Sequence, residues 1–426
     1  MAAKNEEVII YEDEAYRKLY PITYLRPTFG ILCGFGNLVH RVSRILPDAR
    51  VNLIARRQLE EFLKFYFPEC VVNEPPENGG LFLNGRCLNL PGAILKSQGQ
   101  KVFRSRGAIV GFRTDGEIAL DPESGVVAQR AIAELTEQMS VDDVEVMVLE
   151  HPWDLIRYNP ELLGEDFQTF GGGGVDGDVD TLAVVYGDAS LLSIGPGSKV
   201  EAFCVLDLRG GPVVIGDEVT ISSHSVVQGP CYIGNGSRVQ SAQVRAGTSM
   251  GPSCQVSGEV ECTVFQGWSN KQHLGYMGHS WIGEWVNLGA GTNNSDLKNN
   301  YQSIRVGPED SAVDTQMLKL GCFVADHSKT GIGCLLNTGA IVGPFCSLLG
   351  GSVSPRYIPP FSWQGPNGLE EYRLDKAIST ARVVMSRRSV EMSDAYERLV
   401  RNLFEQVRGG QDGTFSPAAG HKGSGR

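Results

Sequence analysis

The stretch "IGDEVTISSHSVVQGPCYIGNGSRV", residues 215–239, places a small aliphatic residue at every sixth position. A period of six matches neither the 3.6-residue period of an α-helix nor the two-residue alternation of an ordinary strand. It is typical of a parallel β-helix of hexapeptide units, in which the repeated aliphatic side chains stack in the interior and glycine serves at the corners. The stretch therefore predicts a β-helix with three hexapeptide units in each coil.

The same spacing extends in both directions from this stretch. Further members of the series are Ile194, Val200, Leu206, Ile282 and Leu288. The segment "SPRYIPPF", residues 354–361, then ends the pattern, because proline cannot donate a hydrogen bond to a neighbouring strand. We therefore predict that the β-helix spans residues 184–360.

The first part of the chain, residues 1–150, alternates short apolar runs with amphipathic helical patterns. Residues 36–46 and 57–67 repeat apolar residues at the i, i+3, i+4 and i+7 spacing of helices. Three runs are typical of buried strands: residues 8–13 ("VIIYED"), 51–55 ("VNLIA") and 81–88 ("LFLNGRCL"). This order predicts an α/β domain with a parallel sheet, whose ligands would lie at the carboxyl ends of the strands.

Less regular segments separate and follow these two domains. Residues 151–183 hold a short helical pattern and then four consecutive glycines, and we interpret them as a connector. Residues 361–408 have the pattern of a long amphipathic helix or helix pair, which would cap the coils. The polar residues 409–426 are predicted to be disordered.

The composition limits the classes of partner. A net charge of −11, without a run rich in Lys and Arg, argues against nucleic acid and against an anionic membrane. The chain has no apolar stretch near the ~18 residues that a membrane span needs, and no signal-peptide pattern. Ten cysteines without a C-x-x-C pair are typical of reduced, buried side chains, which predicts a cytoplasmic location.

The segment "SNKQHLGYMGHSWIGEWVNLGAGTNNSDLKNNY", residues 269–301, carries polar residues that the repeat does not require. It contains His-Leu-x-Tyr-x-Gly, then Asn-x-Gly-Ala-Gly-Thr, and then a polar loop. In these motifs it resembles the acetyltransferase domain of the GlmU-type bifunctional enzymes, which make UDP-N-acetylglucosamine. The matching residues are His273, Leu274, Tyr276, Gly278, Asn287, Gly289, Ala290, Gly291, Thr292, Asn293, Asn294 and Lys298.

The N-terminal half resembles a diverged bacterial branch of that family. Residues 21–32 ("PITYLRPTFGIL") and 81–88 are similar to the signatures of that branch, whose first domain is a sugar nucleotidyltransferase. The resemblance as a whole implies a nucleotidyltransferase-like α/β domain, followed by a left-handed parallel β-helix and a C-terminal helix.

The resemblance also implies roles for individual residues of the β-helix. His273 would be the general base that takes a proton from the attacking amine, a role that suits imidazole near neutral pH. Asn287 and Tyr276 would contact the sugar phosphate, and Asn287 would be a second catalytic residue. The backbone amide at Ala290 would face the thioester of acetyl-CoA, and Lys298 is a further candidate to bind the sugar phosphate. The alternative is that these are corner residues that only hydrogen-bond turns.

A later coil offers two more candidates. Asp326 and Lys329 lie where the coenzyme A groove of the family passes, and they are candidates to bind that cofactor.

Histidines raise the alternative of a zinc site in the β-helix. His224, His279 and His327 would have to line up on one edge of adjacent coils to share a metal ion. His273 and His279 are six residues apart and so fall on successive faces of one coil. We therefore disfavour a metal site here and interpret His279 as a bystander.

The motif departs from the family in its charges. Members usually carry an arginine and a lysine on earlier coils for the sugar phosphate. Arg245 could bind phosphate here, but Glu261 stands where the lysine is expected, and Asp296 takes the place of a loop asparagine. These changes leave acyl transfer in place and leave the exact acceptor open.

The first domain departs from its family more strongly. Ordinary members open with a glycine-rich loop that holds the triphosphate, whereas an acidic run, residues 12–14, follows the first strand here. Asp13 is predicted to hold Mg²⁺, while Arg26, Asn84 and Arg86 would bind phosphate. The alternative is a domain that has lost catalysis and now binds or scaffolds.

Together these features predict a cytoplasmic, homotrimeric transferase of nucleotide-sugar synthesis. It would move an acetyl group from acetyl-CoA to an amino-sugar phosphate, with glucosamine-1-phosphate as the first choice. It would also move a nucleotidyl group from an NTP, with UTP as the first choice, to the sugar-1-phosphate with Mg²⁺. The alternatives are an enzyme with one of these activities and a non-catalytic trimeric β-helix that binds sugar nucleotides or serves as a scaffold.

Overall fold

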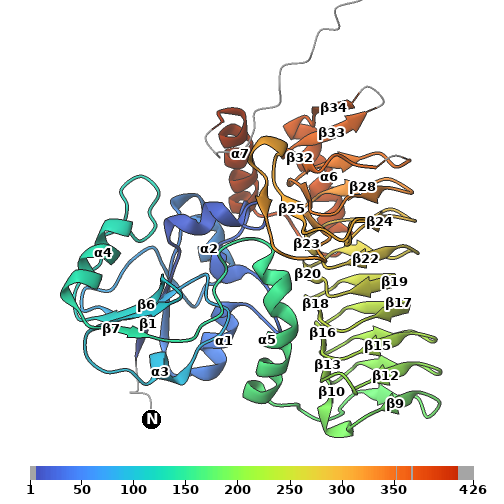
Figure 1. Ribbon diagram of the computed structural model, residues 1–426, viewed down its shortest axis with the longest axis horizontal. Helices are drawn as coiled ribbons and strands as arrows, with labels where there is room; N and C mark the ends of the chain where they lie inside the picture. Colours follow the sequence, from blue (N-terminus) through green and yellow to red (C-terminus); the bar gives the residue numbers. More distant parts are fainter. Residues whose placement is uncertain (1–5, 352, 366–367, 411–426) are drawn as a thin grey trace, which may run out of the picture.

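The computed structural model places an N-terminal α/β domain beside a long β-helix, with two C-terminal helices next to both (Figure 1). It describes residues 6–351, 353–365 and 368–410. Most of the tail that was predicted to be disordered, from residue 411 onward, lies outside the described residues. None of the helices in the described ranges combines the length and apolar character that crossing a bilayer requires.

The N-terminal domain is built on a seven-stranded mixed sheet with the order β3-β2-β1-β4-β6-β5-β7. The central strands β1, β2 and β4 run parallel, as predicted, but β6 is antiparallel to both of its neighbours. The strands are β1 (Glu7–Tyr11), β2 (Arg50–Ile54), β3 (Val71–Val72), β4 (Gly80–Asn84), β5 (Lys101–Ser105), β6 (Ala108–Thr114) and β7 (Val141–Asp143). The helices are α1 (Leu38–Ile45), α2 (Glu60–Tyr66), α3 (Gly92–Leu95) and α4 (Gln129–Gln138), with short 3₁₀ turns at Glu14–Leu19, Thr28–Gly30 and Arg57–Leu59.

The β-helix has three faces, and the first of them is a nine-stranded parallel sheet. Its strands are β10 (Leu192–Ile194), β13 (Val213–Ile215), β16 (Cys231–Ile233), β18 (Thr248–Met250), β20 (Val264–Gly267), β23 (Trp281–Glu284), β27 (Cys322–Val324), β30 (Ala340–Val342) and β32 (Tyr357–Ile358). This first face is turned toward the N-terminal domain (Figure 1).

The second and third faces follow in each coil, and two longer strands turn the corner between them. Those two are β17 (Arg238–Val244) and β19 (Gln255–Glu261). The second face also holds β8 (Asp178–Val179), β11 (Lys199–Val200), β14 (Thr220–Ile221), β21 (Asn270–Lys271), β28 (Lys329–Thr330), β31 (Ser347–Leu348), β33 (Ser362–Gly365) and β34 (Gly368–Glu371). The third face holds β9 (Val184–Tyr186), β12 (Val205–Asp207), β15 (Val226–Gln228), β22 (Tyr276–Gly278), β24 (Asn293–Asn294) and β29 (Leu335–Leu336), and a side hairpin pairs β25 (Arg305–Val306) with β26 (Val313–Asp314).

The hexapeptide series of the sequence forms the interior of these coils. The five aliphatic residues between positions 215 and 239 are at most 1% exposed. Burying each such side chain stabilises the fold by about 1.5–3 kcal/mol, which explains why the period of six dominates the pattern. The predicted parallel β-helix is confirmed.

Aromatic side chains stack along the corner between the first and second faces. Trp268, Trp285, His327, Phe345 and Phe361 all have positive φ at this corner, and neighbouring rings lie 4.6–6.2 Å apart. Burial lowers the pKa of His327 well below its ordinary value. His327 is therefore a fully packed member of this stack.

The C-terminal helices cover this aromatic corner and join it to the first domain. They are α6 (Leu374–Ser386) and α7 (Asp394–Arg408). On α7, the Tyr396 hydroxyl lies 3.0 Å from Nε2 of His327, and its ring contacts Phe62 of α2. The helical region starts later than the predicted position 361, because residues 362–365 and 368–371 add strands to the second face. The helices pack along the side of the coils and against α2, so they do not close the end of the β-helix.

The predicted connector is mostly a 17-residue helix, α5 (Asp154–Phe170), with Pro160 inside it. Its side chains Leu155, Ile156 and Leu162 are at most 2% exposed and share a cluster with apolar residues of the first face. The segment therefore packs as part of the domain boundary, and the first strand of the second face begins within the range that was assigned to the connector.

Candidate functional site

The predicted general base, His273, lies on an exposed corner between the second and third faces. The next coil stacks its Gly-Ala-Gly corner against it, since the Gly291 amide donates a hydrogen bond of 3.0 Å to the carbonyl of Leu274. The coil after that adds the amide of Gly333, which donates to the carbonyl of Ala290 at 2.7 Å. The structure therefore brings His273 and Ala290 together on adjacent coils.

Glycine is required where these corners touch. Gly275 has φ +136°, and a Cβ there would lie 2.1 Å from the carbonyl oxygen of Thr292. Gly291 has φ +72°, a region that other residues seldom adopt. The glycines of the motif thus set the spacing of two coils, and they leave the side chain of His273 and the backbone at Ala290 at the surface.

Asn287 lies exposed on the second face, between Asn270 and Lys329 in register. The Asn270 amide nitrogen is 3.5 Å from Oδ1 of Asn287, and Arg388 donates to Oδ1 of Asn270 at 2.6 Å. The ammonium of Lys329 donates to the carbonyl of His327 at 2.9 Å, and burial lowers the pKa of Lys329 to about 8. Asn287 and Lys329 are therefore neighbours on adjacent coils. No motif in the sequence indicated Arg388, because this residue follows α6 and reaches the second face only through the fold.

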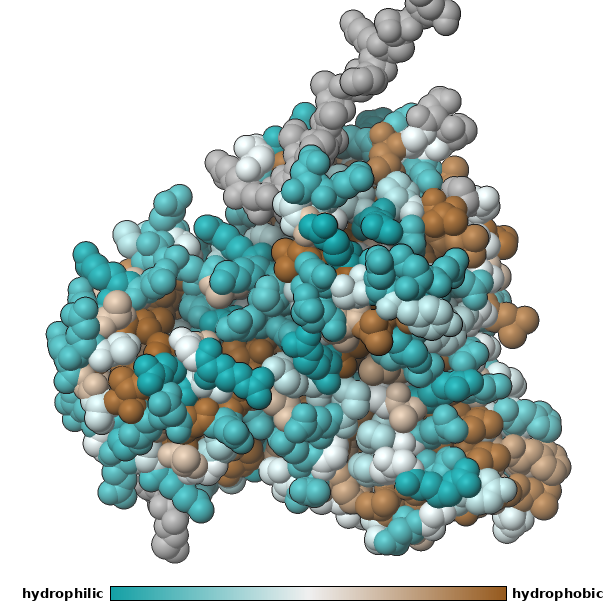
Figure 2. All heavy atoms as spheres, viewed as in Figure 1, coloured by the Kyte–Doolittle hydropathy of each residue, from teal (hydrophilic) through white to brown (hydrophobic). Residues whose placement is uncertain are grey.

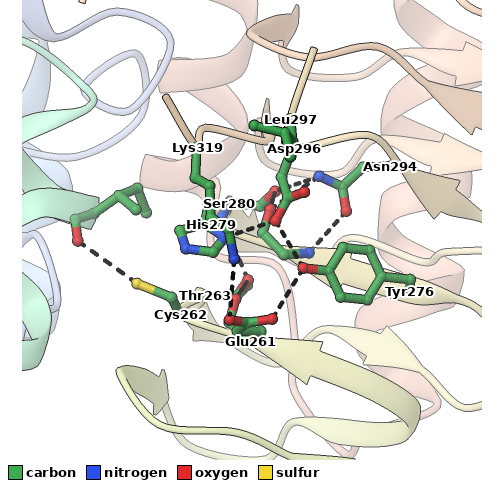
Figure 3. A network of polar contacts seen from close by, with 12 residues as sticks. Glu261, Cys262, Thr263, Tyr276, His279, Ser280, Asn294, Asp296, Leu297 and Lys319 are labelled. Carbon is green, nitrogen blue, oxygen red and sulfur yellow. Dashed lines mark hydrogen bonds and ion pairs between the residues drawn. The ribbon is translucent and has the colours of Figure 1, made fainter. Parts of the chain in front are cut away.

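Tyr276 begins the third face and reaches a polar network at the far end of its strand (Figure 3). Its hydroxyl lies 2.7 Å from Oδ2 of Asp296 and 3.2 Å from Oε2 of Glu261. Burial and these two carboxylates raise the pKa of Tyr276 far above its ordinary value. The phenol is therefore a hydrogen-bond donor at any working pH.

His279 belongs to the same network and is not a bystander. Its Nδ1 lies 2.7 Å from Oδ2 of Asp296, and both side chains are about seven-eighths buried, with 14% and 13% exposed. Burial alone would raise the pKa of Asp296, but hydrogen bonds from His279 and Tyr276 hold it below its ordinary value. A signal was present in the sequence: Asp296 follows His279 by 17 residues, about one coil, so the two residues stack.

The positions where phosphate-binding cations were expected are neutralised. Arg245 lies 2.8 Å from Glu259, and Lys319 lies 3.7 Å from Glu261. Lys298, the other candidate, donates to the carbonyl of Ser303 at 2.6 Å and so is held within its own loop. The network thus presents carboxylates and paired cations rather than an open cationic site.

In the first domain, the structure brings Asp13, Asn84 and Arg86 together at the strand ends. Arg86 binds the Asp13 carboxylate through Nη2 and Nε, at 2.7 and 3.0 Å, and the Asn84 amide donates to it at 2.9 Å. The described residues contain no group of three His, Cys, Asp or Glu side chains placed to hold a metal ion. Because the arginine and the amide already bind the Asp13 carboxylate, it does not fit the predicted Mg²⁺ site.

Arg26 and Asp326 were predicted to bind different ligands, and the structure pairs them with each other. The two side chains are 7% and 0% exposed, and Arg26 Nη2 lies 2.5 Å from Asp326 Oδ1. Both side chains therefore form an ion pair at the domain boundary. The sequence does not show this pair, because the two residues are 300 positions apart.

Comparison with known proteins agrees with this two-part architecture. Residues 8–173 match the family model described as sugar nucleotidyl transferase. The chain is 33% identical over 98 residues to a bifunctional sugar-1-phosphate nucleotidylyltransferase/acetyltransferase of Sulfurisphaera tokodaii, which covers 23% of this chain and 24% of that protein. It is 25% identical to the bifunctional protein GlmU of Methanocaldococcus jannaschii, over 80% of this chain and 79% of that protein. With GlmU of Alkalilimnicola ehrlichii it shares 30% identity over 49% of this chain and 46% of that protein.

Two solved structures of acyltransferases are similar to parts of the chain. A UDP-N-acetylglucosamine acyltransferase of Francisella novicida covers 55% of this chain and 77% of its own, with 12% identity and a TM-score of 0.32. The N-acyltransferase AntD of Bacillus cereus covers 53% and 96%, with 14% identity and a TM-score of 0.19.

The chain thus combines a sugar-nucleotidyltransferase-like α/β domain with a hexapeptide-repeat β-helix, as the sequence predicted. The predicted resemblance to the GlmU-type bifunctional family is confirmed by the family model and by the curated relatives. The chain spans less than half of the first and third of these relatives, and about four-fifths of the second.

Proposed function

We propose that the β-helix transfers an acyl group from acyl-CoA to the amino group of a sugar, with His273 as general base. One observation carries this proposal: the corner with His273 stacks directly on the corner with Ala290, through the hydrogen bond from Gly291 to Leu274. The imidazole of His273 and the backbone at Ala290, which a ligand can approach closely, lie side by side at the surface. Attack on a thioester needs both a base and a donor for the oxyanion.

In the proposed reaction the amine nitrogen attacks the carbonyl carbon of the thioester. The C–N bond forms and the C–S bond breaks, so coenzyme A leaves as a thiolate. His273 takes the proton that the amine loses and then gives it to the thiolate. The amide at Ala290 would stabilise the oxyanion, Asn287 would contact the sugar phosphate, and Lys329 would line the path of coenzyme A on the second face.

The first domain is the basis of a second candidate function, nucleotidyl transfer to a sugar-1-phosphate. The match of residues 8–173 to the sugar nucleotidyl transferase family favours it. The ion pair between Asp13 and Arg86 occupies the strand ends, so we assign no metal-dependent step to these residues. Pyrophosphate release from UTP and N-acetylglucosamine-1-phosphate tests this activity, and its absence with every NTP and sugar phosphate tried would favour a binding domain.

The proposal also specifies the substrates, the location and the oligomeric state. The acyl group is acetyl, the acceptor is an amino-sugar phosphate such as glucosamine-1-phosphate, the nucleotide is UTP, and the protein is a cytoplasmic homotrimer. All ten cysteines are free, which supports a reducing compartment.

Apolar side chains line the corner between the second and third faces, on the side away from the first domain (Figure 2). Phe203, Leu274 and Ile332 are 56%, 78% and 79% exposed there, which supports contact with further copies of the chain.

Release of coenzyme A from acetyl-CoA in the presence of glucosamine-1-phosphate, glucosamine and other amino sugars tests the acyl transfer. The proposal predicts release that depends on both substrates. Hydrolysis of acetyl-CoA at the same rate without any amine would contradict it.

A further inference from the structure

One interior position of the β-helix holds a lysine instead of an apolar residue. On the second face, Lys271 pairs in register with the interior residue Val256 of the preceding coil. On its other side the bridge between Asn270 and Asn287 aligns it with Leu288. Lys271 is 2% exposed, so its four-carbon stem lies in the apolar interior between two aliphatic side chains.

The ammonium of Lys271 lies beneath the corner that carries His273. It donates to the carbonyl of Ser257 at 2.8 Å and to the carbonyl of His273 at 3.2 Å. These two carbonyls belong to equivalent corners of two successive coils. Gly258 makes room for the ammonium, since a Cβ there would lie 3.0 Å from Nζ.

An aliphatic side chain would fill this position at lower cost, as Val256 and Leu288 do in the adjacent coils. A buried ammonium is expensive unless its hydrogen bonds are made, and here it bonds two backbone carbonyls. What the lysine adds beyond packing is a fixed link between the two corners.

We propose that Lys271 is a positioning residue, which ties the corner of His273 to the coil before it and so fixes the imidazole in the acyl-transfer site. This inference rests on the proposed function, in which the side chain of His273 takes the proton of the amine. Lys271 touches no substrate itself, because it lies inside the β-helix.

The strength of the link depends on pH. Burial lowers the pKa of Lys271 to about 8, and the nearby carboxylate of Glu259 opposes that shift. Glu259, on the coil before, is the charged group that acts on this ammonium, and it is itself paired with Arg245. The two hydrogen bonds of Lys271 therefore lose their charge assistance as pH rises through about 8.

Hydrogen exchange measured by mass spectrometry on the peptide 269–279 tests the link without any need for activity. In Lys271→Met we expect exchange of this peptide to be about 10-fold faster than in wild type, because the corner loses its two charge-assisted hydrogen bonds. Lys199→Met, which changes an exposed lysine on the same face, serves as the control and should leave the peptide unchanged. Equal exchange in Lys271→Met and wild type would overturn the proposal.

Kinetics separate positioning from a purely structural role. Lys271→Met should lower kcat for acyl transfer by about 10-fold at pH 7 with KM for acyl-CoA unchanged, and should remove a decline in kcat above pH 8 that wild type shows. Both effects should vanish when the substitution is made in His273→Ala. An equal loss in both backgrounds would overturn the positioning role.

Two further outcomes are informative. If Lys271→Met does not fold, Lys271→Leu, which matches Leu288 at the equivalent interior position of the next coil, takes its place in the exchange experiment, and exchange equal to wild type would overturn the proposal. If wild type releases no coenzyme A with any amino sugar, the acyl-transfer proposal fails, while the exchange experiment still decides whether Lys271 holds the corner.

Discussion

Arg26 and Asp326 bind each other across the boundary between the two domains, with Nη2–Oδ1 and Nη1–Oδ2 distances of 2.5 and 3.1 Å. Glu284 lies 3.6 Å from the same guanidinium, and burial is outweighed by these carboxylates, so the pKa of Arg26 is raised. The pair fixes the N-terminal domain against the first face of the β-helix. It also removes two residues that the sequence suggested for ligand binding.

Removing one partner of this pair should destabilise the whole chain. Asp326→Asn leaves the buried guanidinium with less compensating charge, and we expect a loss of about 3–5 kcal/mol in the free energy of unfolding. Urea unfolding followed by circular dichroism measures it. The control is Asp143→Asn, which breaks an exposed pair with Arg104 and should leave the midpoint unchanged. An Asp326→Asn protein as stable as wild type would show that the pair does not hold the domains together.

The network around Asp296 should contribute stability that acid removes. The pKa of Asp296 is lowered in the folded protein, so its contribution is present above the unfolded pKa, near 4, and is lost as pH falls through the folded pKa. Asp296→Asn should therefore cost about 1–3 kcal/mol at pH 7, with a smaller difference from wild type at pH 3. Urea midpoints at the two pH values provide the measurement, and a difference that grows in acid would contradict the assignment.

Lys271 should affect stability in the opposite pH range. Its folded pKa of about 8 lies below its ordinary value of 10.5, so the unfolded chain binds more protons between these values and stability rises with pH. Lys271→Met lacks this contribution, so it should be more stable than wild type at pH 7.5, by a margin that shrinks at pH 9.5. Lys329, whose pKa is lowered in the same way, is present in both proteins and cancels. A margin independent of pH would mean that the pKa of Lys271 is not lowered in the folded protein.

The sequence predicted the coils because a period of six leaves a local signal, repeated in each unit, and burial of each aliphatic residue is enforced separately. It also placed His273 and Ala290 in one site, since both belong to one motif whose glycines set the corners. Contacts between distant segments left no such signal. Arg26 with Asp326, Arg388 with Asn270 and Tyr396 with His327 depend on how the two domains and the C-terminal helices pack.

Two features could have been predicted from the period itself. Lys271 precedes the interior residue Met277 by six positions, so it occupies an interior position of the repeat. His279 and Asp296 are about one coil apart, which places polar side chains one above the other. The residue type at a single position does not reveal either feature, because the register of the repeat determines which side chains meet.

The most direct test of the central claim is the rate of coenzyme A release from acetyl-CoA and an amino sugar by wild type and by His273→Ala, at pH 7. Loss of a general base costs about 10²–10⁴-fold in kcat, so we predict a decrease of at least 100-fold with KM for acetyl-CoA little changed. His224→Ala, at a corner three coils earlier, is the matched control and should retain wild-type activity. A His273→Ala protein that is as active as wild type would contradict the assignment of this corner as the acyl-transfer site.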